Sequence, residues 1–240
     1  MVEPTGVDAP IVTQIGSVPF TDVDRAIDYS MRHEIPFLPE LTARGDGMLQ
    51  YAKRPGRLAA LAAFKRNRFT TVKVQSVGPA TLITSGYSED DAVAAVYRHL
   101  EAIFDGLIAE ATILFLDEPA LGTVGFDYER LWQPLLETFP AIHGVHTCGN
   151  MQWDLLAAAP IDMISFDASR YEITSYLGSD RSVRIAWGAL EKKDVRDYRP
   201  GDLITGPCGM PHTTYSPSDA ERRLESLTKL ADQFRQQPRR

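Results

Sequence analysis

The 240-residue sequence contains little cysteine and no long apolar segment. Its two cysteines are too few for a disulfide framework. No run approaches the ~18 consecutive apolar residues of a membrane span, so we expect no membrane partner. Acidic residues outnumber basic ones by 32 to 25, and the formal net charge is −7. This balance argues against a broad basic surface that would bind nucleic acid.

The first residues lack a basic segment followed by an apolar core, so we expect no secretory signal and a cytoplasmic location. In that reducing compartment each cysteine can be a metal ligand, a nucleophile or a core residue. The glycine spacings of dinucleotide-binding and P-loop sites are also missing. The chain is 44% hydrophobic, which is enough to bury a core.

Apolar segments typical of buried parallel strands alternate with segments of helical periodicity. The expected strands are 11–18, 36–41, 69–77, 111–116, 142–147, 161–166, 183–187 and 203–205. Eight strands in this length give units of about 30 residues, the size of a strand and its helix. We therefore predict an α/β fold, a compact (β/α)8 TIM barrel that forms a single domain over residues 1–240, with flexible ends at 1–10 and 235–240. A doubly wound open sheet is the alternative.

In such a barrel the reactive side chains lie where strands end. The strand ends carry His146, Cys148, Asp167 and Cys208. In an extended strand residues i and i+2 point to one side, ~6.6 Å apart, so His146 and Cys148 can converge on one ion. Cys208 would complete a His/Cys/Cys set for Zn²⁺, and Asp167 is a candidate fourth ligand. Alternatively, both cysteines are small core residues and His146 makes an ordinary hydrogen bond.

Candidate substrate-binding groups lie at other strand ends. Asp117 follows a buried strand and could hold a substrate ammonium group, or it could cap the following turn. The same two interpretations apply to Glu40. Ile15, Gly16 and Ser17 could offer backbone N–H groups and a hydroxyl to a substrate carboxylate, or form a tight turn.

His212 follows Cys208 by four residues in a polar loop. An unperturbed imidazole titrates near neutral pH, so His212 is a candidate proton donor. A solvated loop histidine is the alternative. Together with Asp117, it completes the set of candidate catalytic residues.

These motifs, in this order, resemble the C-terminal catalytic barrel of cobalamin-independent methionine synthase, in the uroporphyrinogen decarboxylase/methionine synthase superfamily. The matching segments are Ile15-Gly16-Ser17, Glu40 with Met48 and Tyr51 downstream, Val77-Gly78-Pro79-Ala80-Thr81, Asp117-Glu118-Pro119-Ala120-Leu121, His146-Thr147-Cys148 and Cys208-Gly209. The resemblance implies that the first segment contacts the carboxylate of homocysteine and that Asp117 binds its amino group. It also implies zinc ligation by His146, Cys148 and Cys208.

This sequence departs from the family at two strand ends. Asp167 stands where the family carries a liganding glutamate. The segment 187–191 lacks the family's proton-donating histidine.

The function that the resemblance implies is a zinc-dependent S-methyltransferase that moves a methyl group to a thiol, most simply to homocysteine to give methionine. His146-Thr147-Cys148-Gly149-Asn150 also resembles zinc methyltransferases that take their methyl group from a corrinoid protein. The expected donor is thus a methylated corrinoid (cobalamin), with a corrinoid protein as partner, or methyltetrahydrofolate. A metal-free decarboxylase of the same superfamily and a non-catalytic zinc- or corrinoid-binding module of a methyl-transfer complex are the alternatives.

Overall fold

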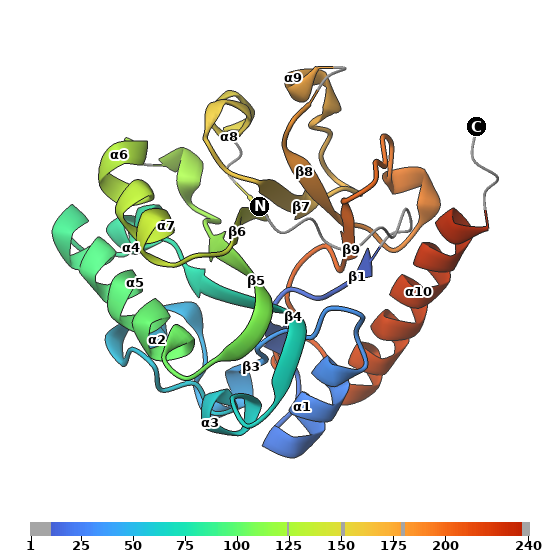
Figure 1. Ribbon diagram of the computed structural model, residues 1–240, viewed down its shortest axis with the longest axis horizontal. Coiled ribbons are helices and arrows are strands. Elements are labelled where there is room, and N and C mark those ends of the chain that lie inside the picture. The colour runs from blue at the N-terminus through green and yellow to red at the C-terminus, as the bar shows by residue number, and fades with distance from the viewer. Residues whose placement is uncertain (1–10, 124, 150–151, 179–180, 237–240) are drawn as a thin grey trace.

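The computed structural model describes residues 11–123, 125–149, 152–178 and 181–236. A curved parallel sheet occupies its centre, and its seven strands follow the order β1-β9-β8-β7-β6-β5-β4 (Figure 1). The strands of this sheet are β1 (Ile11–Val12), β4 (Arg68–Val77), β5 (Ile108–Asp117), β6 (Ile142–Thr147), β7 (Met163–Asp167), β8 (Arg184–Gly188) and β9 (Leu203–Thr205). A separate parallel pair consists of β2 (Ser17–Val18) and β3 (Glu40–Leu41).

Helices surround the outer face of the sheet, as Figure 1 shows. They are α1 (Val23–Met31), α2 (Met48–Lys53), α3 (Leu61–Phe64), α4 (Pro79–Thr84), α5 (Glu89–Phe104), α6 (Tyr128–Leu131), α7 (Gln133–Thr138), α8 (Trp153–Ala158), α9 (Thr174–Leu177) and α10 (Pro217–Arg235). Side-chain caps define where the two longest helices begin. Ser88 accepts a hydrogen bond from the Asp91 N–H at the start of α5, and Ser216 with Asp219 forms a capping box at the start of α10.

The prediction of a closed eight-stranded barrel is wrong, because the sheet has seven strands and is open between β1 and β4. The segment expected to be the second strand, 36–41, meets β4 only in an isolated bridge between Phe37 and Lys73. Pro36 and Pro39 lie in this segment, and proline has no N–H to donate to a ladder. Only β3 remains of it as a regular strand, and β3 pairs outside the main sheet.

The expected first strand, 11–18, is also interrupted, and it divides into β1 and β2. Side chains take the backbone donors that a continuous ladder would use. The Val12 N–H donates to a carboxylate oxygen of Glu34 at 2.8 Å, and the Gly16 N–H donates to Oε1 of Gln75, also at 2.8 Å. Hydrogen bonds to side chains distant in sequence thus replace strand pairing at this edge of the sheet.

Buried residues alternate between the two faces of the strands. Along β5, Leu114 and Leu116 belong to the large core between sheet and helices, whereas Ile113 and Phe115 belong to a smaller inner cluster. Alternation with period two places Asp117 on the same inner face as Phe115. The inner face therefore changes from apolar to acidic as β5 reaches its carboxyl end.

Within the described residues, no helix is both long enough and apolar enough to cross a bilayer. Residues 1–10 and 237–240 of the predicted flexible ends lie outside the described part of the chain. Arg235 and Gln236 are described, and Arg235 ends α10 and pairs with Glu34.

Candidate metal centre

Three predicted metal ligands converge at the carboxyl edge of the sheet. His146 lies in β6, Cys148 directly follows that strand, and Cys208 lies beyond the end of β9. One ligand atom from each residue lies within 4.8 Å of the other two. Among the described residues, no other group of three His, Cys, Asp or Glu side chains meets this condition. Side chains about 60 positions apart in sequence thus meet at one point, as strand ends in a curved parallel sheet allow.

His146 is held so that one ring nitrogen stays available. Its Nδ1 lies 3.0 Å from the Ser165 hydroxyl, on the neighbouring strand β7. Its Nε2 is buried and has no hydrogen-bond partner among the described residues. A buried polar atom without a partner costs free energy unless it has a ligand, and a metal ion satisfies a neutral imidazole nitrogen. One nitrogen of this ring and the two sulfurs form a donor set that fits Zn²⁺.

The two sulfurs have different proton affinities. A hydrogen bond from Cys148 lowers the pKa of the Cys208 thiol to about 4, and His146 acts in the same direction. The same sulfur–sulfur hydrogen bond, with burial, raises the pKa of Cys148 above its usual value. Both thiols are free. A divalent ion that bound both sulfurs as thiolates would displace the proton of the hydrogen bond between them.

Asp167, the predicted fourth ligand, lies outside this group. It ends β7 and its Oδ1 accepts hydrogen bonds from the Ser169 N–H at 3.1 Å and from the Ser169 hydroxyl at 2.6 Å. The structure therefore assigns this oxygen to the turn after β7, and the grouped donors are one nitrogen and two sulfurs.

His212, the predicted proton donor, is an exposed loop residue near the same edge. The ring Nδ1 of His212 lies 2.9 Å from the Thr42 hydroxyl, and the backbone N–H of His212 donates to that hydroxyl at 3.0 Å. Thr42 follows β3, the strand that contains Glu40. The loop after Cys208 is thus attached to the segment that carries a candidate substrate-binding carboxylate.

Asp117 and Glu40 are buried carboxyl groups, each with one oxygen left free. Asp117 Oδ1 and Glu40 Oε1 have no hydrogen-bond partner among the described residues. Burial raises the pKa of Asp117 to about 6, although His146 and Lys73 oppose the shift. Burial and the charge of Asp117 raise the pKa of Glu40 well above its usual value. These two buried acids with free oxygens, here called the acidic pair, are suited to a cation.

Lys73 and Gln75 lie next to the acidic pair, although sequence reasoning missed both. Lys73 Nζ donates to Gln75 Oε1 at 2.5 Å, and Gln75 Nε2 donates to Asp117 Oδ2 at 2.7 Å. Lys73 is fully buried, and burial lowers its pKa to about 8. The sequence offered one signal for Lys73: it lies between Val72 and Val74 in an apolar strand, so its charge must lie on one face of a buried strand.

The Ile15-Gly16-Ser17 segment lies against both parts of the site. Ile15 is buried in the inner apolar cluster, and the Gly16 N–H is already bound to Gln75. Ser17 accepts a hydrogen bond from the Met210 N–H through its carbonyl oxygen. A Cβ at Gly209 would lie 2.8 Å from Ser17 Oγ, so only glycine lets the Cys208 loop approach so closely.

Glu118, the neighbour of Asp117, has a structural role. Its carboxylate accepts hydrogen bonds from the Ala80 and Thr81 N–H groups, the Thr81 hydroxyl and the indole N–H of Trp132. The two N–H groups belong to the first turn of α4, where backbone donors lack helical partners. Glu118 therefore joins β5 to α4, and its carboxylate has no oxygen free for a ligand.

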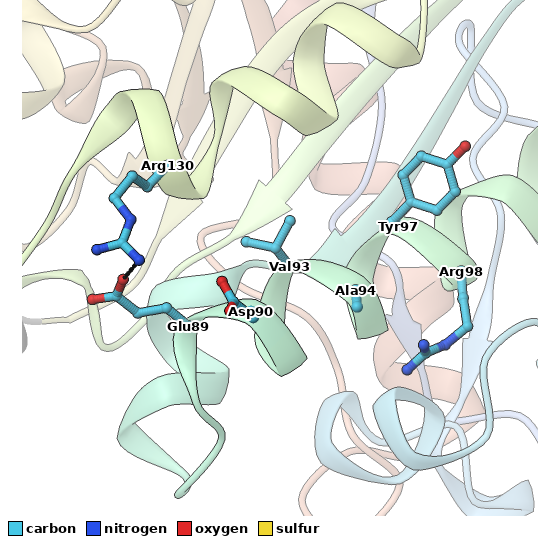
Figure 2. A pocket seen from close by; sticks show the side chains of 7 residues that line it. All are labelled: Glu89, Asp90, Val93, Ala94, Tyr97, Arg98 and Arg130. Atoms are coloured by element: carbon cyan, nitrogen blue, oxygen red, sulfur yellow. Dashed lines mark ion pairs between the residues drawn. The ribbon is translucent and has the colours of Figure 1, made fainter.

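A shallow depression of about 340 Å³ lies on the outer surface between α5 and α6 (Figure 2). It is lined by Glu89, Tyr97 and Arg130 among others, and Glu89 pairs with Arg130 at 2.8 Å. These side chains come from helices and not from strand ends. The depression contains none of the residues that the sequence singles out.

Comparison with protein-family models, with curated proteins and with solved structures gives no significant match to this chain.

Proposed function

We propose that this protein is a zinc-dependent methyltransferase that moves a methyl group to the sulfur of an amino-acid thiol, with homocysteine as the acceptor and methionine as the product. The observation that carries the proposal is the meeting of His146, Cys148 and Cys208 donor atoms within 4.8 Å. The resemblance of the flanking motifs to cobalamin-independent methionine synthase supports the same reaction class.

His146, Cys148 and Cys208 would hold the metal. When bound, Zn²⁺ supplies the chemistry that lowers the pKa of an incoming thiol and keeps it a thiolate at neutral pH. Three protein donors suit a catalytic zinc, since structural sites use four. Ser165 fixes the orientation of the His146 ring through Nδ1, which leaves Nε2 for the metal.

Asp117 and Glu40 would bind the amino group of the acceptor. Their free oxygens, Oδ1 and Oε1, are buried acceptors that an ammonium group can satisfy. The pKa values of both acids are raised, and a cation beside them would favour their ionised forms. The acidic pair therefore favours an acceptor that carries both a thiol and an amine.

The methyl donor in this proposal is a methylated corrinoid or methyltetrahydrofolate. Holding thiol and methyl group within ~3–3.5 Å of one another would supply much of the rate. A corrinoid protein is the partner that the first donor implies. The site needs two reduced cysteines, so the proposal places the protein in a reducing compartment such as the cytoplasm.

Metal content and methyl transfer test the proposal. Purified protein should bind one zinc per chain and should methylate homocysteine from methylcobalamin or from methyltetrahydrofolate. The variants Cys208→Ala and His146→Ala should lose both properties. His143→Ala is a matched control, because His143 lies in the same strand and its Nε2 contacts the Phe139 carbonyl oxygen. Full methyl transfer by Cys208→Ala would overturn the zinc mechanism.

Other outcomes identify the alternatives. Absence of zinc together with tolerance of Cys148→Ser is expected of a metal-free decarboxylase. Stoichiometric zinc without turnover by the isolated chain is expected of a binding module in a methyl-transfer complex.

A further inference from the structure

Gln75 has an amide orientation that its neighbours determine. Two donors point at its Oε1, the Lys73 ammonium group at 2.5 Å and the Gly16 N–H at 2.8 Å. If the amide turned over, its NH₂ group would face these two donors and both hydrogen bonds would be lost. The ammonium charge makes that exchange especially unfavourable in a buried site.

This orientation of the Gln75 amide directs Nε2 toward the acidic pair. Nε2 donates to Asp117 Oδ2 at 2.7 Å, which leaves Oδ1 as the free oxygen. A hydrogen bond from Gln75 also favours the carboxylate form of Glu40. One amide group therefore holds the Asp117 carboxylate and also lowers the pKa of Glu40.

We infer that Lys73 is a positioning residue, which acts through the Gln75 amide to hold Asp117 with Oδ1 free for the amino group of the acceptor. This inference rests on the proposed function. It adds a residue from the interior of the sheet that would not itself touch the acceptor.

The surroundings of Lys73 and Gln75 leave both side chains little freedom to move. Lys73 is fully buried, and its Nζ lies 4.8 Å from the centre of the Phe115 ring. Gly16 is so close to Gln75 that a Cβ there would lie 2.6 Å from the amide carbon. Phe115 in turn occupies the space next to Gly144, where a Cβ would be 2.3 Å from the ring. Close packing on all sides makes the amide direction a property of the fold and not of a mobile side chain.

The test compares an acceptor that has an amine with one that lacks it. Binding of homocysteine and of 4-mercaptobutanoate, its deamino analogue, is measured by calorimetry with zinc-loaded protein. The wild type should prefer homocysteine. We expect Lys73→Met and Gln75→Met each to reduce this preference by about tenfold or more, the effect of losing a hydrogen bond to a charged group. The affinity for 4-mercaptobutanoate and the zinc stoichiometry should stay unchanged.

The double variant Lys73→Met/Gln75→Met makes the test specific. If Lys73 acts through Gln75, the double variant should show the same preference as Gln75→Met alone. A loss that adds across the two sites would overturn the inference, and so would an unchanged preference in Lys73→Met. A general structural defect would lower the affinity for both thiols equally, and that result would also count against the inference.

Two further outcomes are distinct. If Lys73→Met does not fold, Gln75→Met still tests the inference. An unchanged preference for homocysteine in Gln75→Met would show that the amide does not position Asp117, so Lys73 could not act through it. A wild type that binds neither thiol would overturn the proposed function itself, and the inference with it.

Discussion

The imidazole of His146 and the hydroxyl of Ser165 lie on adjacent strands, with Nδ1 and Oγ 3.0 Å apart. This contact engages one nitrogen and leaves the other, Nε2, buried with no hydrogen-bond partner in the part of the chain that the structure describes. A histidine that ligates a metal almost always has its second nitrogen bound in this way, because that bond sets the tautomer and the ring orientation. The relationship suggests how the site could be tested without removing a ligand.

Ser165→Ala should weaken zinc binding while all three proposed ligands remain. We expect a loss of about 10- to 100-fold in affinity, as for other residues that orient a metal ligand. Competition against a chromophoric chelator measures it. Ser226→Ala, a half-buried position on α10 whose hydroxyl contacts the Arg222 carbonyl oxygen, is the control. Equal zinc affinity in both variants would show that Ser165 does not orient the ligand.

Asp167→Asn separates a three-donor site from a four-donor site. The Asp167 carboxylate lies outside the grouped donor atoms and accepts two hydrogen bonds from Ser169. We therefore expect Asp167→Asn to keep one zinc per chain, in contrast to Cys208→Ser. Atomic absorption after dialysis gives the stoichiometry. Loss of zinc from the asparagine variant would restore Asp167 as a ligand.

Glu40→Gln should stabilise the protein and weaken acceptor binding at the same time. The pKa of Glu40 is raised in the folded state, so the ionised group costs stability as the pH rises above about 4.5, its ordinary value. We expect the free energy of unfolding to exceed that of the wild type by an amount that grows as the pH rises above about 4.5. Urea unfolding at several pH values measures the gain. If the variant were less stable than the wild type at pH 8, the ionised Glu40 would not be the source of the expected cost in stability.

Glu118→Ala should destabilise the fold without changing the metal site. The substitution leaves the Ala80 and Thr81 N–H groups and the Trp132 indole N–H buried without their acceptor. We expect a loss of about 3 kcal/mol or more. Glu110→Ala, at an exposed position on the same strand, should change stability by less than about 0.5 kcal/mol. Thermal unfolding of zinc-loaded protein compares the two.

Acid should destabilise the protein through two buried histidines, His33 and His99, that do not belong to the metal centre. Burial lowers the pKa of both His33 and His99 to about 4 from 6.5. Neutral rings therefore contribute stability above pH 6.5, and this contribution is lost as the pH falls toward 4. The double variant His33→Gln/His99→Gln should flatten the dependence of unfolding free energy on pH in that window. An unchanged slope would mean that other groups cause the acid sensitivity.

The strand-end positions of His146, Cys148 and Asp117 could be predicted from sequence, because apolar segments ending in polar residues repeat along the chain. Closure of the sheet could not be predicted in the same way. It depended on whether Pro36 and Pro39 could be accommodated in a ladder, and they leave only the Phe37–Lys73 bridge. The hydropathy of an apolar segment with two prolines predicts a strand. The two missing N–H donors prevent that segment from forming a continuous ladder.

The roles of the two neighbouring acids, Asp117 and Glu118, show a similar limit. Asp117 ends β5 and Glu118 follows it, and alternation alone places them on opposite faces. Only the packing of α4 and Trp132 against Glu118 satisfies its carboxylate completely and leaves Asp117 as the acid with a free oxygen.

By itself, the sequence determined the α/β alternation, the helix-forming and strand-forming segments and the chemical types of the candidate ligands, because these follow from local periodicity and from the donors that each side chain carries. The tertiary structure decided that the sheet is open, that three distant donors meet at its edge, and that Lys73 and Gln75 lie next to the acidic pair. These features depend on the curvature and register of neighbouring strands, which bring together residues whose separation along the chain carries no information about their distance in space.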